Sequence, residues 1–268
     1  MTILWCLLFL CHTATAAWCT ANPPTAGTYQ VSAGSTCTLT AQVKITGGNA
    51  LRISGDPDRS TQLALIQRAS ESSKHRLFWI ASGTLFLRDV QLLNGDATTG
   101  SGFEDGGLVL VHGGSSTALL NTTGRVHLGS GKAQHGGALA AVGPNSFVHA
   151  AGSEITNNQA TVLGGGIFVS LGAIVQVTDT LIKSNSALSY DGGGAALQFA
   201  NSTLIALRTM FANNYGLRYG GGVVVCALHS CPTEHPAVFR SIDSTFVSNT
   251  GGAGGAMYAW DGALIQAK

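Results

Sequence analysis

Four copies of a short motif recur along the second half of the chain, and this repeat constrains the fold more than any other feature. Each copy has a large apolar residue, two variable positions and an asparagine. The copies run from Ile155 to Asn158, from Ile182 to Asn185, from Phe211 to Asn214 and from Phe246 to Asn249. The asparagines are 27, 29 and 35 residues apart. Spacing of this size is typical of a solenoid, in which each unit packs mainly on its neighbours.

A second motif, a glycine pair followed by an apolar residue, alternates with the first. Its clear copies start at Gly165, Gly193, Gly221 and Gly254, and weaker copies start at Gly106 and Gly136. Counted from the second glycine of each pair, the intervals are 30, 29, 28, 28 and 33 residues. The last interval is long because residues 226–236 intrude, and we interpret them as a loop closed by its own cysteines. The repeating unit is therefore about 28 residues long.

Composition decides which kind of solenoid fits. The chain of 268 residues contains 36 glycines, and only 10% of its residues are charged. This composition disfavours helical repeats, because glycine is a poor helix former. One unit contains three short strand-like runs, at residues 167–170, 173–177 and 180–183. We therefore predict an all-β fold, a single-stranded right-handed parallel β-helix solenoid with about 28 residues and three short strands per coil.

The first motif has two predicted roles in each coil. Asparagine tolerates the left-handed backbone conformation of a tight turn, so we place the motif asparagines at turns, where stacked copies form a hydrogen-bonded ladder. The apolar residue three positions earlier is predicted to point inward and stack on its copies. These turn and core residues are Asn158, Asn185, Asn214, Asn249, Ile155, Ile182, Phe211 and Phe246. The glycine pairs are predicted to let the chain bend close to its neighbour.

The N-terminus predicts export. An apolar run from Ile3 to Cys11 precedes small residues at 14–17, the layout of a secretory signal peptide over residues 1–17. The run is too short for a membrane anchor, which needs ~18 or more apolar residues. We expect a secreted or cell-surface protein in which residues 18–268 form one β-helix domain, incomplete at its C-terminus.

Cysteine usage agrees with export. Four cysteines follow the predicted signal peptide: Cys19, Cys37, Cys226 and Cys231. An even number in an exported chain predicts two disulfides, with three possible connectivities. Local pairing, Cys19 with Cys37 and Cys226 with Cys231, is the simplest of the three. The cysteines lack the clustered C-x-x-C pairs that are typical of zinc sites.

The rest of the composition narrows the classes of partner. The net charge is +1 and the basic residues are scattered, so we expect no nucleic-acid partner. No apolar stretch is long enough to predict a membrane span. Two sequons, at Asn121 and Asn201, predict a glycoprotein if the secretory pathway is eukaryotic.

The F-x-x-N and G-G-A-[ILV] motifs together resemble the repeats of polymorphic outer-membrane proteins, which are in turn similar to the pectate-lyase-like superfamily of right-handed β-helices. The resemblance covers roughly residues 90–265. It implies the fold more strongly than any chemistry, because that superfamily holds lyases, hydrolases, adhesins and passive scaffolds.

Enzymes of this superfamily cleave acidic polysaccharides, and the resemblance implies clustered aspartates with a basic residue or a histidine. From Asp89 onward only Glu104 and Asp105 are adjacent acids, although carboxylates from different coils can still meet. The nearest histidine motif, Gln134 to Gly137, is interpreted as a solvated turn. We therefore expect no catalytic residue, no metal and no cofactor.

Register arithmetic gives one candidate ligand surface. Tyr190 and Asp191 precede one glycine run, and Arg218 and Tyr219 precede the next, so stacked coils place the pairs about 4.8 Å apart. Tyrosine rings beside an acid and an arginine are suited to a sugar. The alternative is a surface ion pair beside aromatic residues of the turns. Such a pair need not indicate a binding site, because exposed ion pairs are common and contribute little to stability.

A second in-register set consists of Asp179, Arg208 and Asp243, each six positions before a motif asparagine. We interpret this column as structural pairing across strands.

Two functions follow from these features. The first is a structural, adhesive or glycan-binding role, with surface glycans or cell-surface proteins as partners. The second is a polysaccharide lyase or glycoside hydrolase of the pectate-lyase-like superfamily. Two acids and a base gathered in one groove would favour the second.

Overall fold

The computed structural model describes residues 24–56, 63–99, 104–113, 116–120, 125–229 and 231–268. The predicted signal peptide, Cys19 and the sequon at Asn121 lie outside these residues. The described chain is almost entirely strand, with one short 3-10 helix, η1 (Ala227–His229). The prediction of an all-β fold is confirmed.

The strands form four parallel sheets, which we call A, B, C and D. Sheet A contains β1 (Gly27–Gln30), β4 (Asn49–Ser54), β7 (Gly83–Arg88), β10 (Ser116–Leu120), β14 (Ser146–Ala151), β18 (Ile174–Thr178), β22 (Thr203–Leu207), β26 (Ala237–Ile242) and β30 (Ala263–Ala267). Sheet B contains β2 (Thr36–Leu39), β5 (Ala64–Arg68), β8 (Val90–Leu93), β11 (Val126–Gly129), β15 (Glu154–Thr156), β19 (Leu181–Lys183), β23 (Met210–Ala212) and β27 (Thr245–Val247).

The other two sheets hold the remaining strands. Sheet C contains β3 (Val43–Ile45), β6 (Phe78–Ile80), β9 (Val109–His112), β13 (Leu139–Val142), β17 (Ile167–Ser170), β21 (Ala195–Gln198), β25 (Val223–Val225) and β29 (Met257–Ala259). Sheet D contains β12 (Lys132–His135), β16 (Gln159–Leu163), β20 (Ser186–Ala187), β24 (Tyr215–Tyr219) and β28 (Thr250–Ala253).

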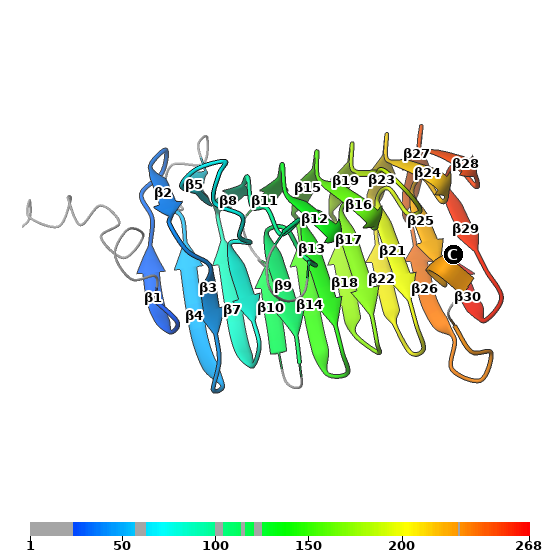
Figure 1. Ribbon diagram of the computed structural model, residues 1–268, viewed down its shortest axis with the longest axis horizontal. Helices are drawn as coiled ribbons and strands as arrows, with labels where there is room; N and C mark the ends of the chain where they lie inside the picture. The colour runs from blue at the N-terminus through cyan, green and yellow to red at the C-terminus, as the bar shows by residue number, and fades with distance from the viewer. Residues whose placement is uncertain (1–23, 57–62, 100–103, 114–115, 121–124, 230) are drawn as a thin grey trace, which may run out of the picture.

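The chain visits the sheets in the order A, B and C from β1 to β9, and in the order A, B, D and C from β10 onward, and we call one such passage a circuit. Each strand pairs in parallel with the strand at the same place in the next circuit, as β14 does with β18 and β18 with β22. Successive circuits therefore lie side by side along the long axis of the molecule (Figure 1). This arrangement is consistent with a β-helix-like solenoid.

The expected three strands per coil describe only the first circuits, β1 to β9. From β12 onward a fourth strand occupies the segment between each motif asparagine and the next glycine run, so the expectation is wrong for the rest of the chain. The lengths of these strands vary, from two residues in β20 to five in β16 and β24. Their backbone is held extended by parallel partners in the adjacent circuits, as β20 is by β16 and β24.

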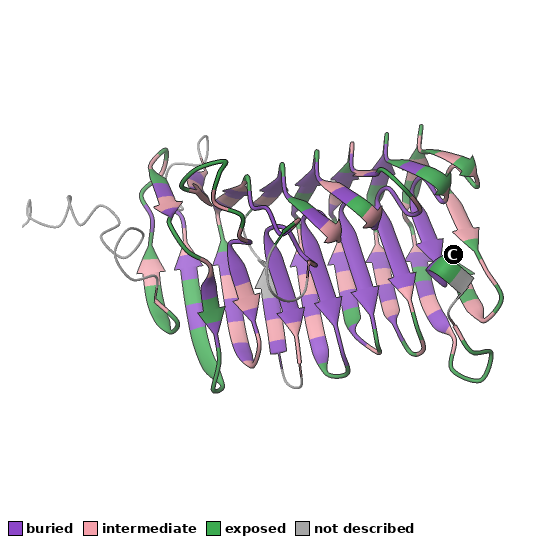
Figure 2. Cartoon of the chain, in the orientation of Figure 1, coloured by how far each residue is buried: buried purple, intermediate pink, exposed green. Residues whose placement is uncertain are grey.

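The predicted core column is present in sheet B. Ile155 pairs in register with Ile182, Ile182 with Phe211, and Phe211 with Phe246. The first three are fully buried, and the Phe211 and Phe246 rings stack with centroids 4.8 Å apart. Figure 2 shows buried residues repeating along successive circuits in this way. Stability therefore accumulates across circuit interfaces, because no circuit encloses its apolar residues alone.

The predicted asparagine ladder is also present. The amide Nδ2 of Asn158 donates to Asn185 Oδ1 at 2.9 Å, Asn185 to Asn214 at 3.0 Å, and Asn214 to Asn249 at 2.9 Å. The left-handed residue, however, is the one before each ladder asparagine. Those residues are Asn157, Ser184, Asn213 and Ser248, with φ of 57°, 55°, 53° and 52°. The preceding residue makes the turn, and this frees the ladder amide to point inward.

The glycine run at residues 192–194 shows the predicted steric role. Gly192, just before the motif pair, takes the left-handed conformation, with φ of 72°. A Cβ on the following residue, Gly193, would overlap backbone atoms of Tyr215 in the next circuit. The motif is therefore explained by backbone geometry.

Candidate functional site

The candidate ligand residues lie where sheet D leads into sheet C. The backbone nitrogen of Arg218 donates to the carbonyl oxygen of Tyr190 at 3.0 Å, and Gly192 donates to Tyr219 at 3.0 Å. Tyr190 is therefore level with Arg218, and Asp191 is level with Tyr219. The structure brings the two predicted pairs together in the expected adjacent circuits.

Arg218 is exposed and lies against two aromatic rings. Its guanidinium carbon is 5.1 Å from the ring centroid of Tyr190 and 5.2 Å from that of Tyr219. Both distances are within the ~6 Å range of cation–π attraction. This attraction limits the rotation of the guanidinium and leaves N–H donors at its edge.

Two aromatic residues that the sequence analysis missed complete this surface. The Tyr258 ring stacks on Tyr219, with centroids 4.5 Å apart and planes 24° apart. The Trp260 ring meets both tyrosines edge to face, each at 5.2 Å. We call Tyr190, Arg218, Tyr219, Tyr258 and Trp260 the Arg218 surface.

The three tyrosine rings of the Arg218 surface rest on a second cluster of buried apolar residues, separate from the main core, whereas Trp260 packs against the main core. The buried members of this cluster include Leu110, Phe168 and Val224. The residues that pack against it include Tyr190, Tyr219 and Tyr258. Each apolar residue lies four positions after a left-handed glycine, as Val224 follows Gly220. Tyr258 likewise lies four positions after a left-handed glycine, Gly254. This spacing is the sequence signal that could have identified it.

Asp191 differs from its neighbours, because it is only 1% exposed. Its carboxylate therefore does not contribute to the exposed part of the Arg218 surface. The charge presented to solvent by this set is that of Arg218 alone. A surface of this kind, one oriented guanidinium bordered by tyrosines, is suited to a carboxylate or a sulfate, which accepts two parallel N–H bonds.

The in-register column of Asp179, Arg208 and Asp243 lies at the corner between sheets A and B, and two of its members pair across circuits as expected. Arg208 donates to both carboxylate oxygens of Asp179, at 2.7 and 2.8 Å, and both side chains are exposed. These hydrogen bonds lower the pKa of Asp179 and raise that of Arg208. Asp243 acts on Arg208 only as a weaker electrostatic neighbour.

A second polar group, which we call the Asp105 cluster, lies farther toward the N-terminus. It contains Asp105, His135, Arg76 and His112. The Nδ1 atom of His135 is 2.7 Å from Asp105 Oδ1, and the imidazole stacks on Phe168 with centroids 4.9 Å apart. His135 is therefore held by two contacts, and the interpretation of this motif as a solvated turn is wrong.

Burial is the largest influence on the pKa of Arg76 and of His112 in the Asp105 cluster. Arg76 is 7% exposed, and burial lowers the pKa of its guanidinium to about 10, against an opposing effect of Asp105. Burial also lowers the pKa of His112, with Asp105 opposing and Arg76 adding to the shift. The cluster joins one carboxylate, two imidazoles and a guanidinium from different circuits, which local sequence spacing does not reveal.

Cys226 and Cys231 form the predicted disulfide. Cys37 is also disulfide-bonded, and its predicted partner, Cys19, lies outside the described residues. Within the described ranges, no group of three or more histidine, cysteine, aspartate or glutamate side chains is arranged to hold a metal ion. No helix among them has the length and apolar character needed to cross a membrane.

Comparison of the chain with protein-family models, with curated proteins and with solved structures gives no significant match.

Proposed function

We propose that this chain is a secreted or cell-surface right-handed parallel β-helix that binds acidic carbohydrate at the Arg218 surface without converting it. The observation that carries the proposal is the exposed Arg218 guanidinium lying against the rings of Tyr190 and Tyr219. The parallel sheets and their recurring strand order support the solenoid. The repeat motifs support a likeness to the pectate-lyase-like superfamily.

Acidic rather than neutral carbohydrate is favoured by the contacts of the rings. Tyr219 already has Tyr258 stacked on it and Arg218 against it, so little of its ring face is left for a sugar. Recognition therefore depends on the guanidinium N–H groups and on the phenol hydroxyls. A uronate carboxylate or a sulfate ester supplies the matching pair of oxygens.

A glycan array that contains uronate, sulfated and neutral oligosaccharides tests this proposal. Arg218→Ala is expected to lose binding to the acidic members, by about 10-fold or more if one charge-assisted pair is removed. Arg218→Lys is expected to recover only part of it, because a lysine ammonium lacks the planar pair of donors. Arg240→Ala, which removes another exposed arginine on β26, is the matched control. Equal binding by Arg218→Ala and the parent would refute the site.

The Asp105 cluster favours a second candidate, a polysaccharide lyase or glycoside hydrolase. Its carboxylate is within hydrogen-bond distance of the imidazole, an arrangement in which a carboxylate orients a histidine that acts as a general base. Release of products from pectin and alginate, with and without calcium, tests this candidate. Turnover that disappears in both Asp105→Asn and His135→Ala, but persists in Arg218→Ala, would establish catalysis at the cluster and contradict a purely binding role.

A further inference from the structure

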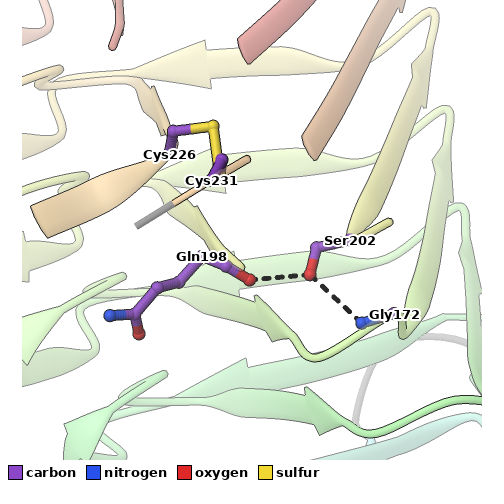
Figure 3. The surroundings of a disulfide bond; sticks show 5 residues. All are labelled: Gly172, Gln198, Ser202, Cys226 and Cys231. Atoms are coloured by element: carbon purple, nitrogen blue, oxygen red, sulfur yellow. Dashed lines mark hydrogen bonds between the residues drawn. A yellow bond between two sulfur atoms is a disulfide. The ribbon is translucent and has the colours of Figure 1, made fainter. Parts of the chain in front are cut away.

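The turn that carries the sequon at Asn201 borders an apolar groove. The groove has a volume of about 680 Å³, and its lining residues include Pro144, Leu171, Phe199 and Pro232. Ser202 Oγ donates to the carbonyl oxygen of Gln198 at 2.7 Å and accepts from the Gly172 nitrogen at 3.4 Å. Figure 3 shows this turn together with the Cys226–Cys231 disulfide.

Phe199 and Leu171 have an unusual conformation for bulky residues. Their φ values are 65° and 54°, in the left-handed region that such side chains seldom adopt, and they are 38% and 50% exposed. Two circuits before Leu171 the equivalent residue is Gly113, and two circuits before Phe199 it is Gly143. Glycine adopts the left-handed conformation without strain, so large apolar side chains are not needed for the turn itself. Their presence indicates a contact outside the protein core.

Asn201 is placed to accept a substituent beside these residues. It is exposed, and among the described residues its side-chain amide has no hydrogen-bond partner. A Cβ built on Gly172 would lie 3.9 Å from Asn201 Cβ and 3.9 Å from Pro144 Cβ. Thr203, the hydroxyl residue of the sequon, donates from Oγ1 to the Asn201 carbonyl oxygen at 3.4 Å. The attachment atom therefore emerges at the edge of the groove.

We propose that Asn201 is N-glycosylated and that the first N-acetylglucosamine lies in this groove, with its C–H face on Phe199. The glycan comes from a lipid-pyrophosphate-linked oligosaccharide of a eukaryotic secretory pathway. Asn201 Nδ2 attacks C1 of the first sugar and loses one proton, a C–N bond forms, and the C1–O bond to the pyrophosphate carrier breaks. No oxidation or reduction accompanies the transfer.

Residues 232–235 contribute the far side of the same site. Pro232 lines the groove, and the His235 carbonyl oxygen accepts from the Asn201 backbone nitrogen at 3.3 Å. The first sugar would then contact residues from three successive circuits. A face of C–H groups against an aromatic ring buries apolar area on both partners, which stabilises the folded state.

The test uses the full chain expressed in a eukaryotic secretory host, with Thr123→Ala to remove the other sequon. Peptide mass spectrometry is expected to find Asn201 occupied. Trimming to a single N-acetylglucosamine is expected to leave Tm unchanged, and removal of that last sugar is expected to lower Tm by about 2 °C. Chain that is not exported, or is exported with Asn201 unmodified, overturns the proposal.

The contact with Phe199 is tested by comparing the sugar effect within each variant. In Phe199→Ala, removal of the last sugar is expected to leave Tm nearly unchanged, whatever the stability of that variant itself. Met210→Ala, which truncates an exposed apolar residue on β23, is the matched control and keeps the full effect. An equal sugar effect in Phe199→Ala and in the parent overturns the groove contact.

Discussion

Asn185 Oδ1 accepts two hydrogen bonds from Asn158, one from its backbone nitrogen at 3.0 Å and one from its side-chain amide at 2.9 Å. The amide of Asn185 in turn donates to Asn214 Oδ1 at 3.0 Å and to the Ile155 carbonyl oxygen at 2.9 Å. Asn185 is fully buried, so each of these bonds is made away from water. One side chain therefore links three circuits.

Asn185→Ala is expected to lower the free energy of unfolding by about 2–4 kcal/mol, because it leaves buried donors and acceptors without partners. Urea denaturation measures the change. Asn213→Gly is the matched control, since Asn213 is exposed and left-handed and glycine keeps that conformation. The ladder would be unimportant for stability if the two variants unfolded at the same urea concentration.

Gly193→Ala is expected to cost about 3 kcal/mol, because the added methyl overlaps the Tyr215 backbone and the circuits must separate to accommodate it. Thermal unfolding of the variant is the measurement. Ser189→Ala changes an exposed residue shortly before the same turn and is expected to stay within about 0.5 kcal/mol of the parent. A stable Gly193→Ala protein would contradict the assigned close approach.

Removing the Arg208 side chain is expected to raise the pKa of Asp179 toward its ordinary value, because the hydrogen bonds from Arg208 hold it down. A lowered folded-state pKa means that the pair contributes stability above the unfolded pKa and loses it as pH falls through the folded pKa. Carboxyl-detected NMR titration of the parent and of Arg208→Ala measures the shift. Arg240→Ala should leave the titration of Asp179 as it is.

His127 is expected to make stability fall as the solution is acidified. Burial lowers the pKa of His127, against an opposing effect of Glu154. The unfolded chain then takes up its proton first, so the contribution is fully present above about pH 6.5 and is lost as pH falls through the folded pKa. The Gln91 amide donates to its Nδ1 at 2.7 Å, a contact that favours the neutral ring.

The comparison that isolates this group is the difference in unfolding free energy between pH 7.5 and pH 5.5. His127→Gln is expected to show a smaller decrease than the parent over that range, because it cannot take up the proton. An identical decrease in both proteins would assign the acid sensitivity to other groups.

The parallel, repeating arrangement was predictable because certain residue types recur at the same position of successive circuits. Asn158 and Asn185 mark a ladder because four copies occupy equivalent turns, and Ile155 and Ile182 mark a core column for the same reason. The fourth strand was missed because its copies share no regular alternating pattern: β20 is only Ser186–Ala187, and β24 pairs with β28 through a register shift. Its extended conformation depends on pairing with adjacent circuits, which a single unit does not encode.

The candidate site was predicted less completely. Counting two positions back from each glycine run placed Tyr190 next to Arg218, and the backbone hydrogen bond between them shows this adjacency. This count did not separate buried Asp191 from exposed Arg218, since the second cluster of buried apolar residues was not anticipated. The contact of Asp105 with His135 joins residues 30 apart, and no local motif marks it.

The loop between β25 and β26 spans residues 226–236, whereas the same corner one circuit earlier uses only residues 199–202. Even so, β25 pairs in register with β21 and β29, and β26 pairs in register with β22 and β30. Extra chain at this corner is thus looped out without shifting any strand. The corner is therefore an acceptor for grafted peptides, and a foreign epitope inserted between the exposed residues Thr233 and Glu234 would be displayed on an unchanged scaffold.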